Sequence, residues 1–336
     1  MAEVSIILPV YNAASTIEAA VKSCLSQSFP DFELIIVDDG SSDHSAEILR
    51  QLSEKDKRIR IFSNAHKGIV EALNLAIHES ATNFIARMDA DDIMYPERIA
   101  IQIEFLRKNP DIGLVSSLVE HGGNAVLQEG YATHVNWINS ICTTEEIELN
   151  RFVESPLAHP SVLFRKEITE KHGAYRGGDF PEDYELWLRW MDAGVKMGKV
   201  CKQLLFWNDL PERLSRMDER YSNEAFNRIK TNYLIRFLED KIAGRKIWLC
   251  GAGRGTRRKS DLLLESAYDF GGYLDVDPKK TGKIFNGLSV SLAEDIPAKE
   301  DAYIVSYVGT RGARDVIRKD LKARGYAEGK DFVMAG

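Results

Sequence analysis

The sequence predicts an α/β protein in which a larger strand–helix domain is followed by a smaller one. Short apolar runs alternate with segments of helical periodicity, which is typical of a mainly parallel sheet. Two acidic clusters directly follow apolar strands, and a second alternation begins near Lys246. With 336 residues, the chain has room for one large domain or two ordinary ones.

The first domain opens with a nearly continuous apolar run, which is typical of a strand buried on both faces of a sheet. A helical pattern follows, with Ile17, Val21 and Cys24 on one face. The alternation then continues, and we expect strands and helices in turn at 4–10, 13–27, 32–37, 44–55, 59–63, 68–80 and 83–88.

The pattern is less regular beyond residue 95. Residues 120–160 show no topology that we can assign, and 208–220 mix charges of both signs, which indicates a connection. The remaining elements are expected at 96–108 (helix), 113–119 (strand), 161–164 (strand), 184–193 (helix) and 221–241 (helix). We divide the chain into a first domain at 1–210, a linker with a long helix at 211–243, and a second domain at 244–336.

Charge is unevenly distributed along the chain. The net charge is −7, but residues 245–336 hold 17 basic against 13 acidic residues, a net of +4, which leaves −11 for 1–244. A basic C-terminal domain indicates an anionic partner, or else ordinary variation of the surface. The sequence does not define the oligomeric state.

Hydropathy and cysteine spacing bear on location. No apolar run approaches the roughly 18–20 residues of a membrane-spanning helix, and the N-terminal run is interpreted as a strand instead of a signal peptide. The four cysteines are far apart and form no CxxC pair, which excludes a zinc ribbon and argues against a disulfide framework. We therefore expect a cytoplasmic protein, with peripheral membrane association left open.

The cluster Asp89-Ala90-Asp91-Asp92 follows an apolar strand. Three carboxylates this close repel one another unless a cation neutralises them, and oxygen ligands favour Mg²⁺ or Mn²⁺. The alternative is a solvated acidic turn. Because ligands bind beyond the carboxyl ends of parallel strands, the position favours a metal site.

Two further acidic pairs have both a functional and a structural interpretation. Asp38-Asp39 ends a predicted strand, where a carboxylate binds a base N–H or ribose hydroxyls, or where the segment caps the next helix. Glu182-Asp183 begins a predicted helix, where one carboxylate serves as general base or simply stabilises the positive helix end.

In this order, the motifs resemble the family 2 glycosyltransferases of GT-A fold, over roughly residues 4–210. The motifs are VSIILPVYN, FELIIVDDGSSD, FIARMDADDIMYPERI, HPSVLF and PEDYELWLRW. Each motif is loose by itself, but the ordered set is specific. The resemblance implies a Rossmann-like mixed sheet. It also implies transfer of a sugar, with inversion, from a nucleotide diphosphate donor, a UDP-sugar being favoured.

The resemblance assigns roles by position. Pro9, Tyr11 and Asp39 are expected to hold the nucleotide base, with Asp39 on a base N–H. Such an assignment implies that the donor lies at the carboxyl ends of the first strands.

The same resemblance divides the acidic residues between metal and acceptor. Asp91 is implied as the main metal ligand, Asp89 as a ligand near the ribose, and Ala90 as a donor contact, with a weaker case for Asp92. Asp183 is implied as the base that deprotonates the acceptor hydroxyl. A Lewis-acidic ion for the leaving group and one separate base are the minimum set for an inverting displacement.

Part of the chain departs from the family pattern. Many members carry an Arg/His-rich stretch after the base helix, and here that region has no histidine, so Arg213 and Arg216 are the candidates for diphosphate contacts. His159, in HPSVLF, matches a recurrent position near the active site and competes with a packing role. Glu182 and Trp187 are further candidates for diphosphate or acceptor contacts.

The second domain contains a Gly251-x-Gly253-x-Gly255 turn after a strand, with Asp275 near the place of a ribose-binding acid. Thr256 occupies the third position of the fingerprint. We therefore expect a degenerate Rossmann-like scaffold more than a functional dinucleotide site. A basic cluster fits a phosphate-bearing acceptor or is a solvated helix face, and it consists of Arg254, Arg257, Arg258 and Lys259.

The whole-chain order of motifs also resembles the eukaryotic β-1,3-N-acetylglucosaminyltransferase-like group, which acts as galactosyltransferase on queuosine in tRNA. The acceptor is therefore expected to be a glycan or lipid-linked sugar, or a modified tRNA nucleoside. The alternative function is a non-catalytic nucleotide-sugar sensor or scaffold. Retention of Asp89, Asp91 and Asp183 together argues against that alternative.

Overall fold

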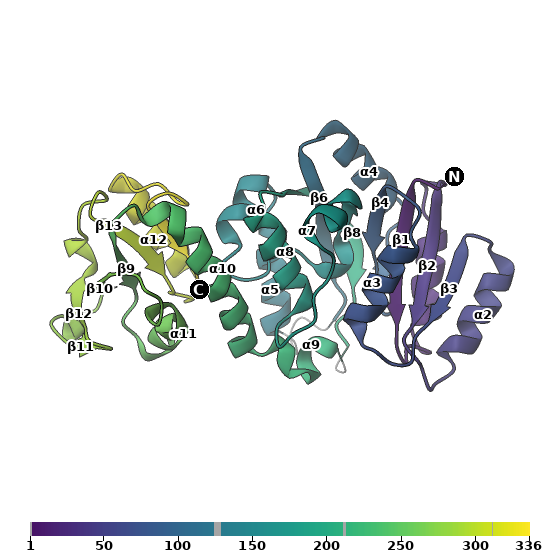
Figure 1. Ribbon diagram of the computed structural model, residues 1–336, viewed down its shortest axis with the longest axis horizontal. Helices are drawn as coiled ribbons and strands as arrows, with labels where there is room; N and C mark the ends of the chain where they lie inside the picture. The colour runs from purple at the N-terminus through teal and green to yellow at the C-terminus, as the bar shows by residue number, and fades with distance from the viewer. Residues whose placement is uncertain (1, 124–128, 211–212, 311) are drawn as a thin grey trace. The chain divides into compact units, whose positions relative to one another are not determined.

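The computed structural model describes residues 2–336 apart from 124–128, 211–212 and 311 (Figure 1). Its contacts divide the chain into two compact units. The N-terminal unit comprises the chain up to Ile147 together with Pro156–Tyr221, and the C-terminal unit comprises Glu148–Ser155 and Ser222–Gly336. The predicted α/β class, with a second and smaller sheet, is confirmed.

The N-terminal unit contains a mixed sheet of eight strands in the order β3-β2-β1-β4-β7-β6-β8-β5. The first four are parallel, β7 runs antiparallel to both of its neighbours, and β6 and β8 are parallel. The strands are β1 (Val4–Val10), β2 (Phe32–Asp38), β3 (Ile59–Ser63), β4 (Phe84–Arg87), β5 (Ile93–Met94), β6 (Ile112–His121), β7 (Leu163–Arg165) and β8 (Lys196–Trp207).

Alternation of side chains along the central strands creates two cores, one on each face of this sheet. In β1, Ile6 and Leu8 belong to one core and Ile7 to the other. Helices α1 (Ile17–Leu25) and α4 (Arg98–Lys108) contribute to the first core, and α3 (Ile69–Glu79) and α8 (Glu182–Asp192) to the second. The unit also contains α2 (Ser45–Lys55), α7 (Glu167–His172), α9 (Leu214–Met217) and the 3₁₀ turns η1 (His159–Ser161) and η2 (Glu219–Tyr221).

The segment without an assignable pattern contains two helices, α5 (Glu129–Ser140) and α6 (Thr144–Asn150). Val135 and Ile138 of α5 are buried in the first core. Thr, His and Asn are mediocre helix formers, so packing of this apolar edge on the sheet, more than propensity, accounts for α5.

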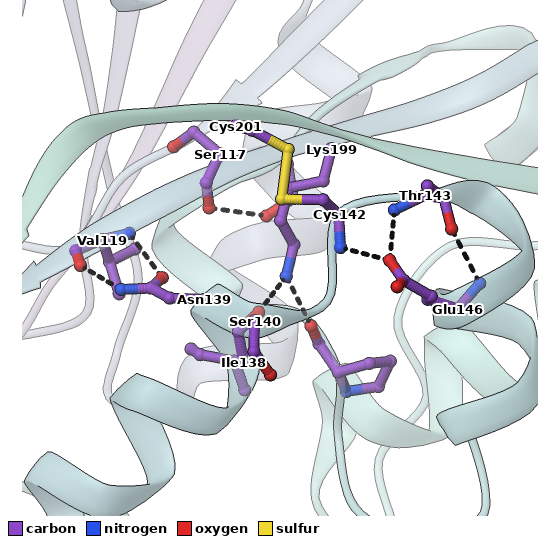
Figure 2. The surroundings of a disulfide bond; sticks show 12 residues. Ser117, Val119, Ile138, Asn139, Ser140, Cys142, Thr143, Glu146, Lys199 and Cys201 are labelled. Atoms are coloured by element: carbon purple, nitrogen blue, oxygen red, sulfur yellow. Dashed lines mark hydrogen bonds between the residues drawn. A yellow bond between two sulfur atoms is a disulfide. The ribbon is translucent and has the colours of Figure 1, made fainter.

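The expectation of no disulfide is wrong, because Cys142 and Cys201 are bonded to each other (Figure 2). Cys142 lies two residues beyond the end of α5 and Cys201 lies within β8, and their Cα atoms are 5.9 Å apart although 59 residues separate them. The packing of α5 on β6, the neighbour of β8 in the sheet, brings them together. The argument from cysteine spacing for a reducing compartment therefore loses its basis, while Cys24 and Cys250 are free and buried.

The C-terminal unit has a sheet of six strands in the order β11-β12-β10-β9-β13-β14, parallel apart from the β11–β12 pair. Helix α10 (Asn223–Ile242), which the sequence predicts as a long helix after a linker, belongs to this unit by its contacts, and its residues Leu234 and Leu238 are fully buried. The other elements are β9 (Lys246–Cys250), α11 (Arg254–Leu264), β10 (Phe270–Asp275), η3 (Pro278–Lys280), β11 (Ile284–Phe285), β12 (Leu288–Leu292), η4 (Ala293–Asp295), β13 (Ala302–Ser306), α12 (Ala313–Ala323) and β14 (Phe332–Met334).

Candidate functional site

A pocket of about 760 Å³ opens in the N-terminal unit beyond the carboxyl ends of β1, β2 and β4. This is where ligands bind in doubly wound sheets. Seven of the residues singled out from the sequence line it together: Pro9, Tyr11, Asp39, Asp89, Ala90, Asp91 and Arg213.

One wall of the pocket is formed by Asp39 and the loop before α3. The Asp39 carboxylate is buried and accepts hydrogen bonds from the backbone N–H groups of Lys67 and Gly68, each at 2.8 Å. His66 lies 3.3 Å from the same carboxylate and stacks on the Tyr11 ring at 4.1 Å between centroids. The half-exposed Tyr11 ring and the fixed Asp39 therefore present an aromatic face beside an acceptor, which suits a planar heterocycle.

The opposite wall carries the acidic cluster. Carboxylate oxygens of Asp89, Asp91 and Asp92 lie within 4.8 Å of one another. Burial, then repulsion from Asp89, raises the pKa of Asp91 to about 6, and the same two causes raise the pKa of Asp92 well above its usual value. Asp92 accepts a hydrogen bond from the Asn208 N–H at 2.8 Å, which ties the cluster to the segment after β8.

These residues fit a hard divalent cation. All three donors are carboxylate oxygens, and among the described residues the buried Oδ2 of Asp92 has no hydrogen-bond partner. A buried acceptor without a donor is costly, and mutual repulsion adds to that cost. A divalent ion held by the three carboxylates together would offset both costs.

Arg87 is a buried cation that sequence reasoning missed. It ends β4, and because Ile85 faces the second core, alternation places Arg87 on the same side of the sheet as Trp187. Its guanidinium forms an ion pair with Asp89, which more than offsets the burial and raises the Arg87 pKa. The signal available was a single charge at the end of an otherwise apolar strand.

A second acidic group lies at the start of α8. Burial, then the neighbouring Glu182, raises the pKa of Asp183 to about 7, and its Oδ1 accepts from the Tyr184 N–H at 2.7 Å. Tyr221 donates to Glu182 at 2.6 Å, which occupies one Glu182 oxygen. Glu182 is fully enclosed, whereas Asp183 is half-buried, so Asp183 is the carboxylate accessible to a substrate.

His159 belongs to the same cluster. Its Nδ1 lies 3.8 Å from Glu182, and its Nε2 is 2.7 Å from the Tyr175 hydroxyl. Burial, then Arg87, lowers the His159 pKa well below its usual value, so the imidazole is neutral. Trp187 is fully buried and packs edge-on against His159, with ring centroids 5.9 Å apart, which makes it a support for His159 with no surface for a ligand.

The two arginines of the segment after β8 have different surroundings. Arg213 lines the pocket, and its charge counteracts the raised pKa values of Asp91 and Asp92. Arg216 is paired with the buried Asp209 at 2.6 Å and donates to the Leu210 carbonyl at 2.6 Å. The structure therefore places Arg213 beside the acidic cluster and Arg216 behind it.

The C-terminal turn resembles a phosphate-binding turn only in outline. Gly251 has φ +95°, and a Cβ added there would lie 2.7 Å from the Thr256 methyl, so the glycine is required by backbone and packing. Asp275 accepts hydrogen bonds from Ala252 and Asp277 N–H groups and pairs with Lys280. Its carboxylate oxygens are thus committed within the unit.

The four basic residues of α11 differ in their exposure to solvent. Arg257 lies over the Phe285 ring at 3.8 Å, whereas Arg254, Arg258 and Lys259 are exposed. Among the described residues, no helix is long and apolar enough to cross a bilayer.

Comparison with known proteins gives concordant matches. The family model described as "Glycosyl transferase family 2" matches residues 5–173. An uncharacterized glycosyltransferase of Haemophilus influenzae is 30% identical over 241 residues, which are 70% of this chain and 74% of the relative. The O-antigen biosynthesis glycosyltransferase WbnJ of Escherichia coli is 32% identical over 190 residues, 55% of this chain and 70% of the relative.

Solved structures share the fold. The S. aureus TarS fragment in complex with UDP-GlcNAc matches with TM-score 0.56 at 16% identity, over 70% of this chain and 66% of that one. The Pyrobaculum calidifontis mannosyltransferase PcManGT, in complex with GDP-Man and Mn²⁺, matches with TM-score 0.51 at 18% identity, over 72% and 65%. The match thus spans just under two thirds of each solved chain, and it concerns the fold alone.

Proposed function

Because this chain belongs to glycosyl transferase family 2, we propose that it transfers a sugar, with inversion, from a nucleoside diphosphate donor to an acceptor hydroxyl. The observation that carries the proposal is one arrangement: three carboxylates within 4.8 Å at the pocket, and a separate carboxylate, Asp183, at the start of α8. Membership of an enzyme family favours this function over a non-catalytic sensor or scaffold.

The donor site follows from the two walls of the pocket. The base lies against Pro9 and Tyr11, with Asp39 accepting a base N–H through the lone pairs that Lys67 and Gly68 leave. Asp91 and Asp89 hold Mn²⁺ or Mg²⁺. When bound, that ion supplies Lewis-acid stabilisation of the charge that develops on the leaving diphosphate.

Asp183 acts as the general base in this proposal. Its raised pKa, about 7, makes it a stronger proton acceptor than an ordinary carboxylate while a large fraction remains ionised near neutral pH. Asp183 takes the proton of the acceptor hydroxyl as the oxygen attacks the anomeric carbon from the face opposite the diphosphate. Tyr221 and neutral His159 hold the adjacent Glu182.

The donor half of the proposal is tested by thermal shift with UDP- and GDP-sugars in Mn²⁺, Mg²⁺ or EDTA. One nucleotide sugar is expected to raise the melting temperature of the wild type only with metal, and Asp91→Asn is expected to abolish that shift. Hydrolysis of the same donor, followed by nucleoside diphosphate release, checks turnover. Stabilisation that persists in EDTA would exclude the metal from donor binding.

Two acceptor classes remain within the proposal. Similarity to an O-antigen biosynthesis enzyme favours a glycan or lipid-linked sugar. The exposed basic residues of α11 favour a modified tRNA nucleoside, the acceptor of the β-1,3-N-acetylglucosaminyltransferase-like group. A radiolabelled-donor assay on lipid-linked oligosaccharide and on total tRNA distinguishes them.

Cytoplasmic location also remains a prediction, tested by cell fractionation. The Cys142–Cys201 disulfide is the observation that speaks against it, because such bonds are rare in reducing compartments.

A further inference from the structure

The pocket-lining cation Arg213 is held between two aromatic rings. Its guanidinium carbon lies 4.9 Å from the Tyr131 ring centre and 4.8 Å from that of Trp207. Its Nη1 donates to the Tyr131 hydroxyl and, at 3.1 Å, to the Asn208 carbonyl. Only 13% of the Arg213 side chain is exposed, and these neutral groups are in direct contact with its guanidinium.

The carboxylate nearest Arg213 in the segment after β8 does not neutralise it. Asp209 lies 4.0 Å from Arg213 but 2.6 Å from Arg216, which therefore forms the closer pair. Arg213 consequently keeps its charge for the pocket, where it lies with Asp89 and Asp91. A planar cation with several N–H donors is suited to phosphate oxygens.

The two rings come from two elements that are firmly joined. Tyr131 lies on α5 and Trp207 ends β8, and the rings contact each other at 5.2 Å between centroids. Beyond the C-terminal end of α5, Cys142 is cross-linked to Cys201 of β8 (Figure 2). Helix α5 is therefore joined to β8 at two places. The Tyr131–Trp207 ring contact lies near the N-terminal end of α5, and the disulfide lies beyond its C-terminal end.

Two hydrogen-bonding side chains reinforce that junction (Figure 2). The Asn139 amide bonds to both the N–H and the carbonyl of Val119 in β6, at 3.0 and 2.8 Å. The buried Lys199 amine of β8 donates to the Ile138 carbonyl at 2.6 Å. The Lys199 bond satisfies a carbonyl in the last turn of α5, and the two side chains together tie that turn to β6 and β8. They therefore limit how far Tyr131 can move relative to Trp207.

We propose that Tyr131 and Trp207 are positioning residues that hold the Arg213 guanidinium toward the diphosphate of the donor. The inference rests on the proposed function, since the diphosphate belongs to that donor. Neutral rings orient the cation without neutralising it, so its charge remains available to the phosphate oxygens of a donor bound in the pocket. The α5–β8 junction keeps the two rings at the spacing that Arg213 requires.

The test is calorimetric binding of UDP and GDP in Mn²⁺, compared with UMP and GMP, for five proteins. These are the wild type, Tyr131→Phe, Tyr131→Leu, Arg213→Ala and the double variant Tyr131→Leu/Arg213→Ala. Arg213→Ala is expected to weaken diphosphate binding about tenfold. Tyr131→Leu is expected to weaken it about fivefold, with Tyr131→Phe close to the wild type because the ring remains.

The double variant separates positioning from general loss of structure. If Tyr131 acts through Arg213, the double variant binds no more weakly than Arg213→Ala alone. Equal fivefold losses in both backgrounds, or equal losses for mono- and diphosphates, would overturn the inference. Unfolding is monitored by circular dichroism, and Tyr131→Met, which also removes the ring but fills more of its space, supplies the test if Leu does not fold. A wild type that binds neither UDP nor GDP would instead refute the proposed function, and with it this inference.

Discussion

Acidic side chains follow a central strand in both units, but their surroundings differ. In the N-terminal unit, Asp91 and Asp92 have raised pKa values because burial and a neighbouring carboxylate both oppose ionisation. In the C-terminal unit, burial also opposes ionisation of Asp275, yet N–H groups and Lys280 outweigh it and lower the pKa. The charges of Asp91 and Asp92 are therefore not balanced by neighbouring groups of the protein. The charge of Asp275 is balanced by N–H groups and by Lys280.

An acidic residue at the end of a strand is a candidate ligand only when its local partners leave its carboxylate oxygens free. The position beyond a parallel strand is the same in both sheets, so topology alone does not identify a site. Local partners distinguish them, because a carboxylate already engaged by two N–H groups and an ammonium has little left for a ribose. Asp39 is intermediate: it accepts two N–H bonds but lines an open pocket.

The largest expected effect contrasts Asp183 with Asp275. Removing the base by Asp183→Asn is expected to lower kcat about a thousandfold while donor affinity is retained. Asp275→Asn is expected to leave kcat/KM unchanged and to lower the melting temperature, because the amide keeps only one acceptor oxygen for the Ala252 and Asp277 N–H groups and no charge for Lys280. Steady-state kinetics with donor titration checks both. A comparable rate loss in Asp275→Asn would make the Gly251 turn a ligand site and break the comparison.

The next effect concerns the cross-link, which only the N-terminal unit contains among described residues. Replacing Cys142 and Cys201 by serine opens a loop of 59 residues and is expected to cost about 4 kcal/mol of stability. Differential scanning calorimetry should show the N-terminal transition moving down. A reducing agent should shift the wild type in the same way and leave the double serine variant unchanged. An unchanged transition in both would show that Asn139 and Lys199 suffice.

A smaller effect follows from the opposite pKa shifts. Folded Asp91, with its pKa raised from 3.8 to about 6, binds its proton more tightly than the unfolded chain does, so stability falls as pH rises between these values. In EDTA, Asp91→Asn is therefore expected to raise the melting temperature by about 2 °C or more at pH 8, and by roughly half as much at pH 5, which lies midway between the two pKa values.

Asp275 supplies the matched control for that pH dependence. Its lowered pKa stabilises the fold above about pH 4, and this contribution is lost as pH falls through the folded pKa. Asp275→Asn should therefore lower the melting temperature at both pH 5 and pH 8. If Asp91→Asn also destabilised at pH 8 without metal, the acidic cluster would not be strained, and the contrast between the units would fail.

The smallest expected effect concerns the exposed basic residues of α11. If the acceptor is tRNA, glutamine at Arg254, Arg258 and Lys259 is expected to weaken the salt dependence of tRNA binding. The slope of log K against log salt concentration should fall in magnitude by about one for each phosphate contact that is lost. Filter binding over a salt series measures that slope. Glutamine at exposed Lys279 and Lys283 is the control on the same unit. An unchanged slope would leave α11 a solvated helix face.

Much of the donor site was predictable because its residues follow strands directly. Pro9, Tyr11, Asp39, Asp89 and Asp91 meet because the carboxyl ends of adjacent parallel strands meet. Arg213 was identified as a candidate from the family resemblance, because it lies where many members carry an Arg/His-rich stretch. Its contacts with Tyr131 and Trp207 were not predictable, since α5 had no clear helical pattern and its position depends on packing.

Other parts of the site came only from long-range contacts. His66 reaches Tyr11 through the loop before α3, and Tyr221 reaches Glu182 from the first residue of the helix that the sequence predicts at 221–241. Arg87 shares a strand with apolar residues. Only its burial and its ion pair with Asp89 identify it as part of the site. Glu182 and Trp187, candidates for ligand contacts by sequence, are enclosed and support their neighbours.

By itself, the sequence determined the strand–helix alternation, the two sheets and the placement of the acidic clusters, because periodicity and strand-end position are local properties. The tertiary structure alone decided which charges are satisfied, which cysteines pair and which rings hold Arg213. These depend on contacts between segments far apart in the chain. Asp275 and Asp91 look alike in the sequence, and only the donors packed around each one separate a structural acid from a candidate metal ligand.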